Sequence, residues 1–335
     1  MLLLAALLLA QVPAAAEPTP APAPTPLRLS VPAFGSKAEA EVRDLPQAAA
    51  DAALRQALGR IVTLDRLTDP ARSDSALAQL NAAAGKGPQK IDPDLFGLLE
   101  RALEFCTWSD GIDGPLGGRL NELWGVRGAA AALPTATTLS AAVDSARCSH
   151  LTLDQRAGTA DLQAGSLADL WGFAEGYAVD QALAVLRQAG STNAWVRAGP
   201  VQRGYGPGPA GKGWWVMLPK VPGATASLEP FELRDRAVAC LQASDRQLGA
   251  GGQTWAPYVQ QQTGRPAEGV LMVVAVTDLA IDAQALGVTM FTAGARQGQL
   301  RLGSVRPSPS VLWLLGTGQG APLTTDYRWS DLRRH

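Results

Sequence analysis

The residues best suited to chemistry lie in one short stretch, 169–180, which reads Asp-Leu-Trp-Gly-Phe-Ala-Glu-Gly-Tyr-Ala-Val-Asp. Gly172 and Gly176 flank the start of a predicted helix, in which apolar residues recur at helical spacing. A turn containing glycine at a helix N-terminus offers free backbone N–H groups and the positive end of the helix dipole, which suit an anion such as phosphate. The same glycines could instead serve only the close packing of helix on sheet. The stretch alone leaves both interpretations open.

Helices and strands on both sides must position this stretch. A helix is predicted from Phe173 to Ala189, with Ala189-Gly190 as its C-terminal stop, and a strand follows at 194–198. Two strands at 27–31 and 38–42 flank a turn at 34–36. The remaining predicted elements are helices at 46–65, from Asp92 to about Cys106, at 137–145 and from Asp282, and strands at 151–153, 160–162, 269–276 and, as the final strand, 310–315.

Composition argues against several classes of function. The chain has 335 residues, of which 47% are hydrophobic, enough for one large core or two smaller ones. Its formal net charge is −1 and it has no basic stripe, so nucleic acid is not an expected partner. Because His150 and His335 are the only histidines, neither histidine-centred catalysis nor a histidine-rich metal site is expected.

The first 26 residues predict export. Residues 1–16 combine a short apolar run with an A-x-A cleavage signal, as a secretory signal peptide does, but they lack a Lys or Arg near the start, so the true start codon stays open. Residues 17–26 alternate proline with Ala or Thr and are predicted to form a stiff linker. No later apolar run is long enough to cross a bilayer. We expect a periplasmic or otherwise extracytoplasmic protein with no membrane span in its mature chain.

Three cysteines, Cys106, Cys148 and Cys240, accompany this export signal. Export permits one disulfide and leaves one thiol over, but the sequence does not say which two residues pair. Cys106 continues the apolar face of its helix, so we expect it to be simply buried.

Several motifs together resemble one family. Stretch 169–180 is similar to the D-x-G-G-x-A-K-G-Y-A-x-D segment of the FAD:protein FMN transferases, once called thiamine-biosynthesis lipoproteins. Segments 75–81, 109–113 and 263–266 resemble the family's S-E-x-S-R-L-N, S-D-G-x-F-D and T-G-x-P motifs. The motifs keep the family's order from about Leu27 to Leu315. We therefore assign 27–317 to a flavin-transferase-like domain and 318–335 to a C-terminal tail without a motif.

The resemblance implies a mixed α/β (α+β) fold of two lobes, with FAD in a cleft between them. It also implies Mg²⁺-assisted transfer of FMN from FAD to a threonine of a target flavoprotein. On this resemblance the flavin-binding residues are Gly35, Ser36, Asp110, Gly172, Ala174, Glu175, Tyr177, Thr263 and Gly264, and the metal-binding positions fall at Asp282 and Gln284.

The chain departs from the family where charge matters most. Trp171 stands at the first glycine of the G-G pair and Glu175 at the lysine, while Pro257 replaces a histidine. Gln284 and Val288 replace an aspartate and a threonine, which lie four residues apart on one helix face. A carboxylate facing a pyrophosphate at about 4 Å costs roughly 4 kcal/mol at an effective dielectric near 20. FAD remains the expected ligand, but Mg²⁺ is not expected to be held firmly, since hard cations need oxygen ligands.

Three hypotheses follow. The first is an exported family member that no longer transfers flavin and acts as a flavin-nucleotide-binding or scaffold protein, with a flavoprotein acceptor or an envelope protein as partner. The second is an active, divergent transferase that uses Gln284, Asp282 or Glu175 in altered roles. The third is an enzyme with unrelated chemistry in the same cleft, for which no G-x-S-x-G, H-E-x-x-H or C-x-x-C motif is present.

Overall fold

The structure, a computed structural model, describes residues 25–128, 133–221, 228–245, 248–250, 253–317 and 321–334. The predicted signal peptide at 1–16 and residues 17–24 of the predicted linker lie outside the described residues.

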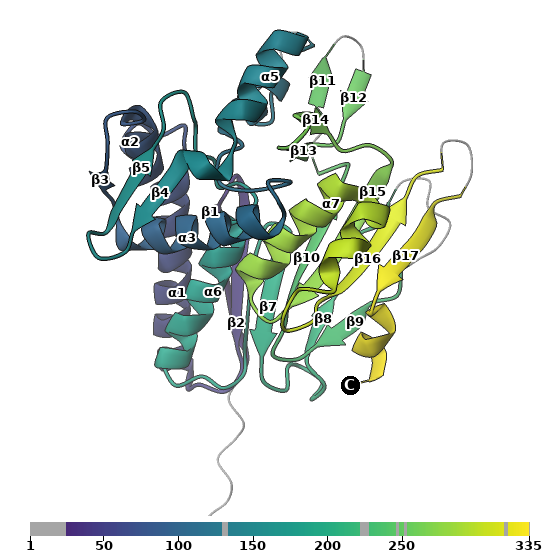
Figure 1. Ribbon diagram of the computed structural model, residues 1–335. Helices are drawn as coiled ribbons and strands as arrows, with labels where there is room; N and C mark the ends of the chain where they lie inside the picture. The colour runs from purple at the N-terminus through teal and green to yellow at the C-terminus, as the bar shows by residue number, and fades with distance from the viewer. Residues whose placement is uncertain are drawn as a thin grey trace, which may run out of the picture.

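An antiparallel sheet of eight strands in the order β1-β2-β6-β7-β10-β15-β16-β17 organises the chain (Figure 1). Its strands are β1 (Leu27–Ala33), β2 (Ser36–Val42), β6 (Ala194–Ala198), β7 (Val201–Tyr205), β10 (Ala237–Gln242), β15 (Val270–Thr277), β16 (Ser310–Leu315) and β17 (Leu323–Tyr327). Side chains alternate across the sheet: in β6, Ala194, Val196 and Ala198 belong to the core, whereas Trp195 and Arg197 line the cleft described below.

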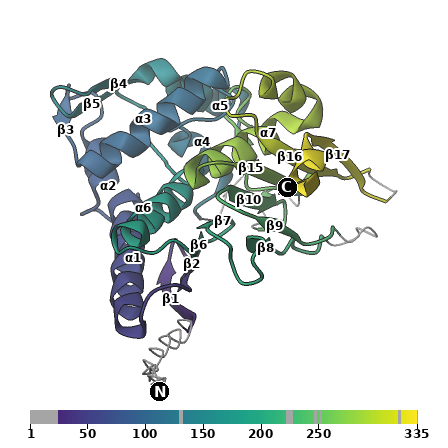
Figure 2. The same ribbon diagram turned by 90° about the horizontal axis from the view of Figure 1, so that it is seen from below.

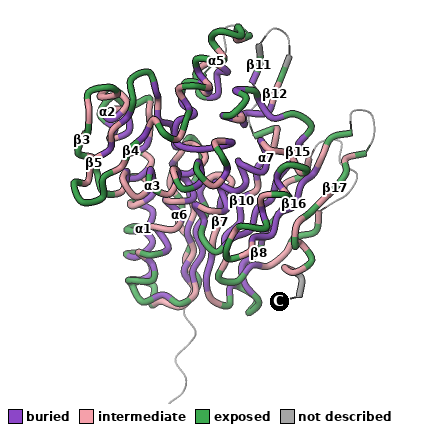
Figure 3. Tube along the Cα trace, viewed as in Figure 1, coloured by how far each residue is buried: buried purple, intermediate pink, exposed green. Residues whose placement is uncertain are grey.

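Three long helices, α1 (Gln47–Thr68), α6 (Ala174–Gln188) and α7 (Ala280–Leu302), cover one face of this sheet (Figure 2). The strand pair β8 (Trp214–Val216) and β9 (Phe231–Leu233) packs on the other face, where Val216 and Leu233 join apolar residues of β10, β15 and β16. Buried residues accordingly concentrate in the sheet and in the helix faces turned towards it (Figure 3).

A second, smaller part lies beyond the helices. It contains α2 (Ala76–Ala82), α3 (Pro93–Trp108), α4 (Gly118–Trp124), α5 (Ala136–Ser145), the 3₁₀ turn η1 (Cys148–His150) and a sheet of β3 (Gln89–Lys90), β5 (Thr159–Leu162) and β4 (Leu151–Asp154). The strand pairs β11 (Leu248–Ala250) with β12 (Gln253–Trp255), and β13 (Val259–Gln260) with β14 (Arg265–Pro266), complete the strands. The predicted mixed α/β, two-lobed fold is confirmed.

Local sequence explains where several of these helices begin and end. Asp92 caps α3 by accepting a hydrogen bond from the Asp94 amide, and Pro93 occupies the first turn, where its missing N–H costs nothing. Thr135 caps α5 in the same way. Helix α4 ends at Gly125, whose φ of 69° lies in the left-handed region that glycine adopts without strain.

The structure differs from the sequence analysis at the C-terminus. Residues 310–315 are not the final strand, because β17 pairs with β16 beyond them and is followed by the 3₁₀ segment η2 (Trp329–Arg334). The residues of β17 are largely polar and half-exposed or exposed, so they lack the apolar alternation that identifies a strand.

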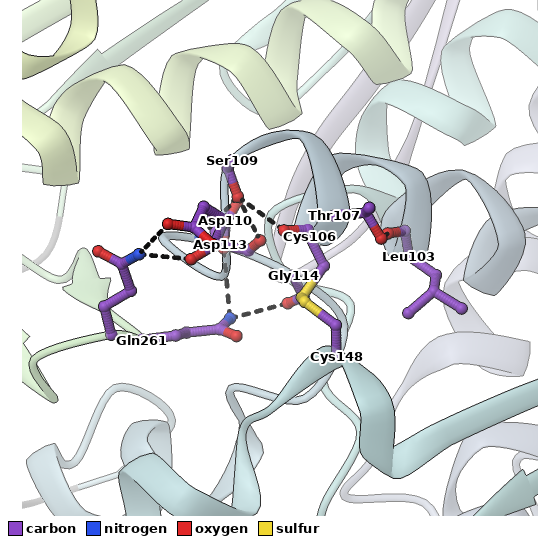
Figure 4. The surroundings of a disulfide bond; sticks show 10 residues. Leu103, Cys106, Thr107, Ser109, Asp110, Asp113, Gly114, Cys148 and Gln261 are labelled. Carbon is purple, nitrogen blue, oxygen red and sulfur yellow. Dashed lines mark hydrogen bonds between the residues drawn. A yellow bond between two sulfur atoms is a disulfide. The ribbon is translucent and has the colours of Figure 1, made fainter. Parts of the chain in front are cut away.

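The cysteine expectation also needs correction. Cys106 is not simply buried: it forms a disulfide with Cys148, which joins the C-terminal turn of α3 to η1 (Figure 4). Cys240 on β10 is the free cysteine of the described residues. Helical spacing could show that Cys106 faces inward, but it could not show what Cys106 meets there. Within the described residues, no helix combines the length and apolarity that a membrane span requires.

Candidate functional site

A cleft of about 810 Å³ opens on the sheet face opposite α1 and α6 and reaches the first turn of α6 and the second and third turns of α7. Its walls come from the β1–β2 turn, from β6, β7 and β10, and from β8. A cleft of this size suits a ligand of up to cofactor dimensions.

The floor of the cleft joins α6 to α7. Glu175 from α6 and Gln284 and Val288 from α7 line it. The Gln284 carboxamide accepts a hydrogen bond from the Gly176 amide (2.8 Å) and donates from Nε2 to the Trp171 carbonyl (3.1 Å) and to Glu175 Oε2. Gln284 is 2% exposed, so these internal contacts satisfy the polar atoms that its burial removes from water.

Glu175 has an electrostatic state that the sequence did not predict. Burial raises its pKa to about 8, although the Gln284 hydrogen bond acts in the opposite direction. The side chain is therefore mostly protonated at pH 7, and the repulsion expected between a carboxylate and a phosphate is much reduced. Glu175 Oε1 also lies close to Gly199, where a Cβ would stand only 2.7 Å from this oxygen.

Aromatic rings form much of the cleft wall. Trp171 and Tyr258 stack with centroids 5.3 Å apart, and Tyr258 Oη donates to Asp245 Oδ2 at 3.0 Å. Burial raises the pKa of Asp245, although its hydrogen bonds with Gln242 and Tyr258 act in the opposite direction. Farther along the sheet face, Trp195 and Trp214 stack at 6.3 Å. These stacked rings make this part of the cleft wall largely apolar.

Four of the predicted site residues line the cleft: Gly35, Ser36, Glu175 and Gln284. Gly35, with φ of 67°, makes the tight turn between β1 and β2 that places Ser36 at the rim. Val288 lines the cleft as well, whereas Thr289 points into the core and donates to the Ala285 carbonyl. Gln284 and Val288 therefore share the helix face that lines the cleft.

The other predicted residues lie away from the cleft lining. Asp110 is exposed beyond α3, with a carboxylate oxygen 3.8 Å from Arg301 Nη2. Tyr177 Oη donates to Asp94 at 3.3 Å. Thr263 is exposed, and Gly264 packs under Leu139 while its carbonyl accepts from Trp124 Nε1.

The remaining three lie on or beside the helix starts. Ala174, the first residue of α6, is buried. Asp282 lies in the first turn of α7 but is held by Arg101 on α3. At Gly172, a Cβ would make ordinary contacts, 3.5 Å from Val288 and 3.6 Å from Asp113 Oδ2.

Gly176 decides between the two interpretations of the glycine stretch. A Cβ at this position would lie 2.4 Å from the Ala280 carbonyl oxygen, so the close crossing of α6 and α7 requires glycine there. Its amide is already bonded to Gln284 and is not free for an anion. At Gly176 the packing interpretation holds.

The residues at the cleft floor do not fit a magnesium ion. Val288 offers only methyl groups, and the single side-chain acceptor of Gln284 is bonded to Gly176. In the part of the chain that the structure describes, His, Cys, Asp and Glu form no group of three or more that could hold a metal. Mg²⁺ prefers an octahedron of oxygen ligands, which these side chains do not provide.

The decisive comparison is with a family model. The model described as "ApbE family" matches residues 34–307, most of the chain. The chain belongs to the ApbE family. Its ApbE fold agrees with the crystal structure of Pseudomonas stutzeri flavinyl transferase ApbE in its apo form, with a TM-score of 0.81 at 20% identity over 92% of this chain and 96% of that chain.

Two curated relatives are each named FAD:protein FMN transferase. The one from Treponema pallidum (strain Nichols) is 36% identical over 149 residues, 42% of this chain and 41% of that protein, so that alignment spans only about two fifths of the relative. The one from Salmonella typhimurium (strain LT2) is 25% identical over 279 residues, 81% of this chain and 77% of that protein.

Sequence motifs missed several lining residues of this ApbE cleft. The cleft is also lined by Asp245, Tyr258, Trp195, Trp214 and Arg28. No sequence motif assigned any of these residues to the site. The alternation along β6 could have placed Trp195 on the face away from the core. The positions of Asp245 and Tyr258 depend on contacts between segments, which the sequence does not reveal.

Proposed function

We propose that this ApbE-family chain is an exported protein that binds a flavin nucleotide in the cleft and does not transfer FMN. The observation that carries the proposal is the hydrogen-bonded cluster of Gln284, Glu175 and the Trp171 carbonyl at the cleft floor. The cluster fills this floor with an amide and a protonated acid, and neither group supplies the positive charge that phosphoryl transfer requires.

Binding of a flavin is supported by the size and chemistry of the cleft. The volume of about 810 Å³ suits a cofactor, and the wall contains the aromatic residues Trp171, Tyr258, Trp195 and Trp214. Binding needs fewer groups than catalysis, so it can persist after transfer is lost.

Residues 1–16 and the Cys106–Cys148 disulfide support the proposed export, because structural disulfides persist in oxidising compartments. The proposed partner is a flavoprotein acceptor or an envelope protein, to which the chain would act as a flavin-bound scaffold. N-terminal sequencing of protein from the native host is expected to begin at or close to Glu17; intact Met1 on cytosolic protein would contradict export.

The test of function measures binding and transfer separately. The chain from Glu17 is titrated with FAD, with binding followed by flavin fluorescence, and is then incubated with FAD, millimolar Mg²⁺ and a threonine-bearing acceptor domain. We expect saturable binding and no FMN mass on the acceptor by mass spectrometry. An FMN mass that a chelator abolishes would instead establish the alternative, an active and divergent FAD:protein FMN transferase.

A variant sharpens this test. Glu175→Lys combined with Gln284→Asp and Val288→Thr restores at the cleft floor the charges and oxygen ligands that a cation and a phosphate need. We expect this triple variant to bind FAD more tightly in Mg²⁺ than the unmodified chain does.

A further inference from the structure

The Gln284 carboxamide ties together three separate parts of the chain. Its Oε1 accepts from the Gly176 amide in the first turn of α6. Its Nε2 donates to the Trp171 carbonyl, in the turn before α6, and to the Glu175 carboxyl. Because Gln284 belongs to α7, these bonds fasten the turn and both helix starts at one point beneath the cleft.

A side-chain NH₂ group has two hydrogens to donate, and here two oxygens receive them. A divalent cation could draw the same oxygens towards one centre by ligating them. The amide achieves this without positive charge, and its own position is fixed by burial, since Gln284 is 2% exposed.

The neighbouring groups give a cation no second place. Val288, one helical turn beyond Gln284, presents methyl groups to the cleft. Asp282, the carboxylate in the first turn of α7, is bound through both oxygens by Arg101, Nε to Oδ1 at 2.8 Å and Nη2 to Oδ2 at 2.7 Å. Bidentate pairs of this kind are the stronger and more directional ion pairs, so Asp282 is not available to the cleft.

We propose that the Gln284 carboxamide takes the place of a divalent cation as the group that holds the cleft floor together, so that the cleft binds its flavin with no divalent cation. The identity of the ligand rests on the proposed function; the replacement of the cation does not. Gln284 is a positioning residue, since it acts by fixing Trp171 and Glu175.

The first experiment uses the metal alone. Mg²⁺ and Mn²⁺ are titrated into the flavin-free chain from Glu17 by calorimetry, and thermal unfolding is followed at millimolar metal. We expect no saturable heat and no rise in Tm. The double variant Gln284→Asp with Val288→Thr should gain a metal-dependent rise in Tm, because a ligand that binds the folded state stabilises it. Stabilisation of the unmodified chain by either metal would overturn the proposal.

The second experiment measures flavin binding in excess EDTA and in millimolar Mg²⁺. We expect the two Kd values of the unmodified chain to agree within about twofold, and Gln284→Met, which keeps the volume but removes the hydrogen bonds, to weaken binding about tenfold in both buffers, equivalent to loss of one to two hydrogen bonds. The matched control is Gln299→Met on the same helix, whose side chain contacts Thr325 away from the cleft and should leave Kd unchanged.

The outcomes separate the two proposals. Flavin binding that disappears in EDTA overturns the cation-free cleft and leaves the proposed function standing. If flavin binds in neither buffer, the proposed function is overturned. The titration with metal alone then decides whether Gln284 takes the place of the cation. If Gln284 had a purely structural role, Gln284→Met and the double variant Gln284→Asp with Val288→Thr would lose stability equally. Metal would then not stabilise the double variant.

Discussion

Arg101 on α3 and Asp282 on α7 meet through two parallel hydrogen bonds, Nε to Oδ1 at 2.8 Å and Nη2 to Oδ2 at 2.7 Å. The pair links the smaller part of the protein to the helix that lines the cleft floor. A carboxylate that the sequence assigned to a metal site is thereby used to hold two parts of the fold together.

Asp282→Asn should reduce stability modestly without affecting the ligand. Because Arg101 is 39% and Asp282 19% exposed, water screens the pair, and we expect a loss of about 1 kcal/mol in the free energy of unfolding. Flavin Kd should not change. Urea denaturation measures the first and fluorescence titration the second. Asp51→Asn, which breaks the more exposed pair with Arg55, is the control and should cost less. A tenfold rise in flavin Kd on Asp282→Asn would show that this carboxylate serves the cleft after all.

Substitution by alanine should have different effects at Gly172 and Gly176, the two glycines of stretch 169–180. At Gly176 a Cβ would meet the Ala280 carbonyl at 2.4 Å and push α6 from α7, so Gly176→Ala should destabilise the chain by about 2–3 kcal/mol and weaken the Gln284 hydrogen bond. At Gly172 the added methyl makes contacts at 3.5 Å or more, so Gly172→Ala should stay within about 0.5 kcal/mol of the unmodified chain. Guanidinium denaturation compares them; equal losses would contradict the packing role of Gly176.

Stability should fall as pH rises because of Glu175. Its ordinary pKa is 4.5 and its folded-state pKa about 8, so the folded state favours the protonated form. The contribution of protonated Glu175 to folding stability is complete below about pH 4.5 and is lost as pH rises through 8. The free energy of unfolding should differ by on the order of a few kcal/mol between these two conditions. Glu175→Gln, which mimics the protonated acid, should therefore match the unmodified chain at pH 4.5 and exceed it in stability at pH 8.5.

The measurement is the difference in unfolding free energy between the two chains across this pH range. Asp113, which is also buried with a pKa raised to about 7 by its burial, titrates in both chains and cancels in the difference. A difference that does not vary with pH would mean that Glu175 is already charged in the fold.

Removal of the disulfide should be costly. Cys106 and Cys148 are 42 residues apart, and closing a loop of that length restricts the unfolded chain by about 4 kcal/mol in the chain-entropy estimate. We expect Cys106→Ala with Cys148→Ala to lose stability of this order in thermal or urea unfolding. A reductant should lower the stability of the unmodified chain towards that of the double variant and leave the stability of the double variant unchanged. Equal responses of the two chains to reductant would argue against the Cys106–Cys148 pairing.

Local patterns predicted the elements well where one periodicity dominates. Helix α6 was expected from Phe173 to Ala189 because its apolar positions repeat at helical spacing. The helix runs over Ala174–Gln188. Gln284 and Val288, which were expected to share one helix face, both line the cleft.

Features that arise from tertiary contacts were not accessible in this way. The protonation of Glu175 depends on its burial, and the stacking of Trp171 on Tyr258 joins segments almost ninety residues apart in the sequence. The replacements of lysine and aspartate were visible from motifs, but the bond that Glu175 and Gln284 make to each other required the crossing of α6 over α7.

Strand β17 covers the side of β16, whose residues Val311, Leu312, Trp313 and Leu314 are buried. Without it, the backbone N–H and C=O groups along that side of β16 would be unpaired beside an apolar surface, which is a template for adding a strand from another molecule. The polar and partly exposed β17 is a poor template of this kind. Strand β17 therefore protects this edge of the sheet from aggregation. A chain cut after residue 317 would be expected to self-associate through its newly opened sheet edge.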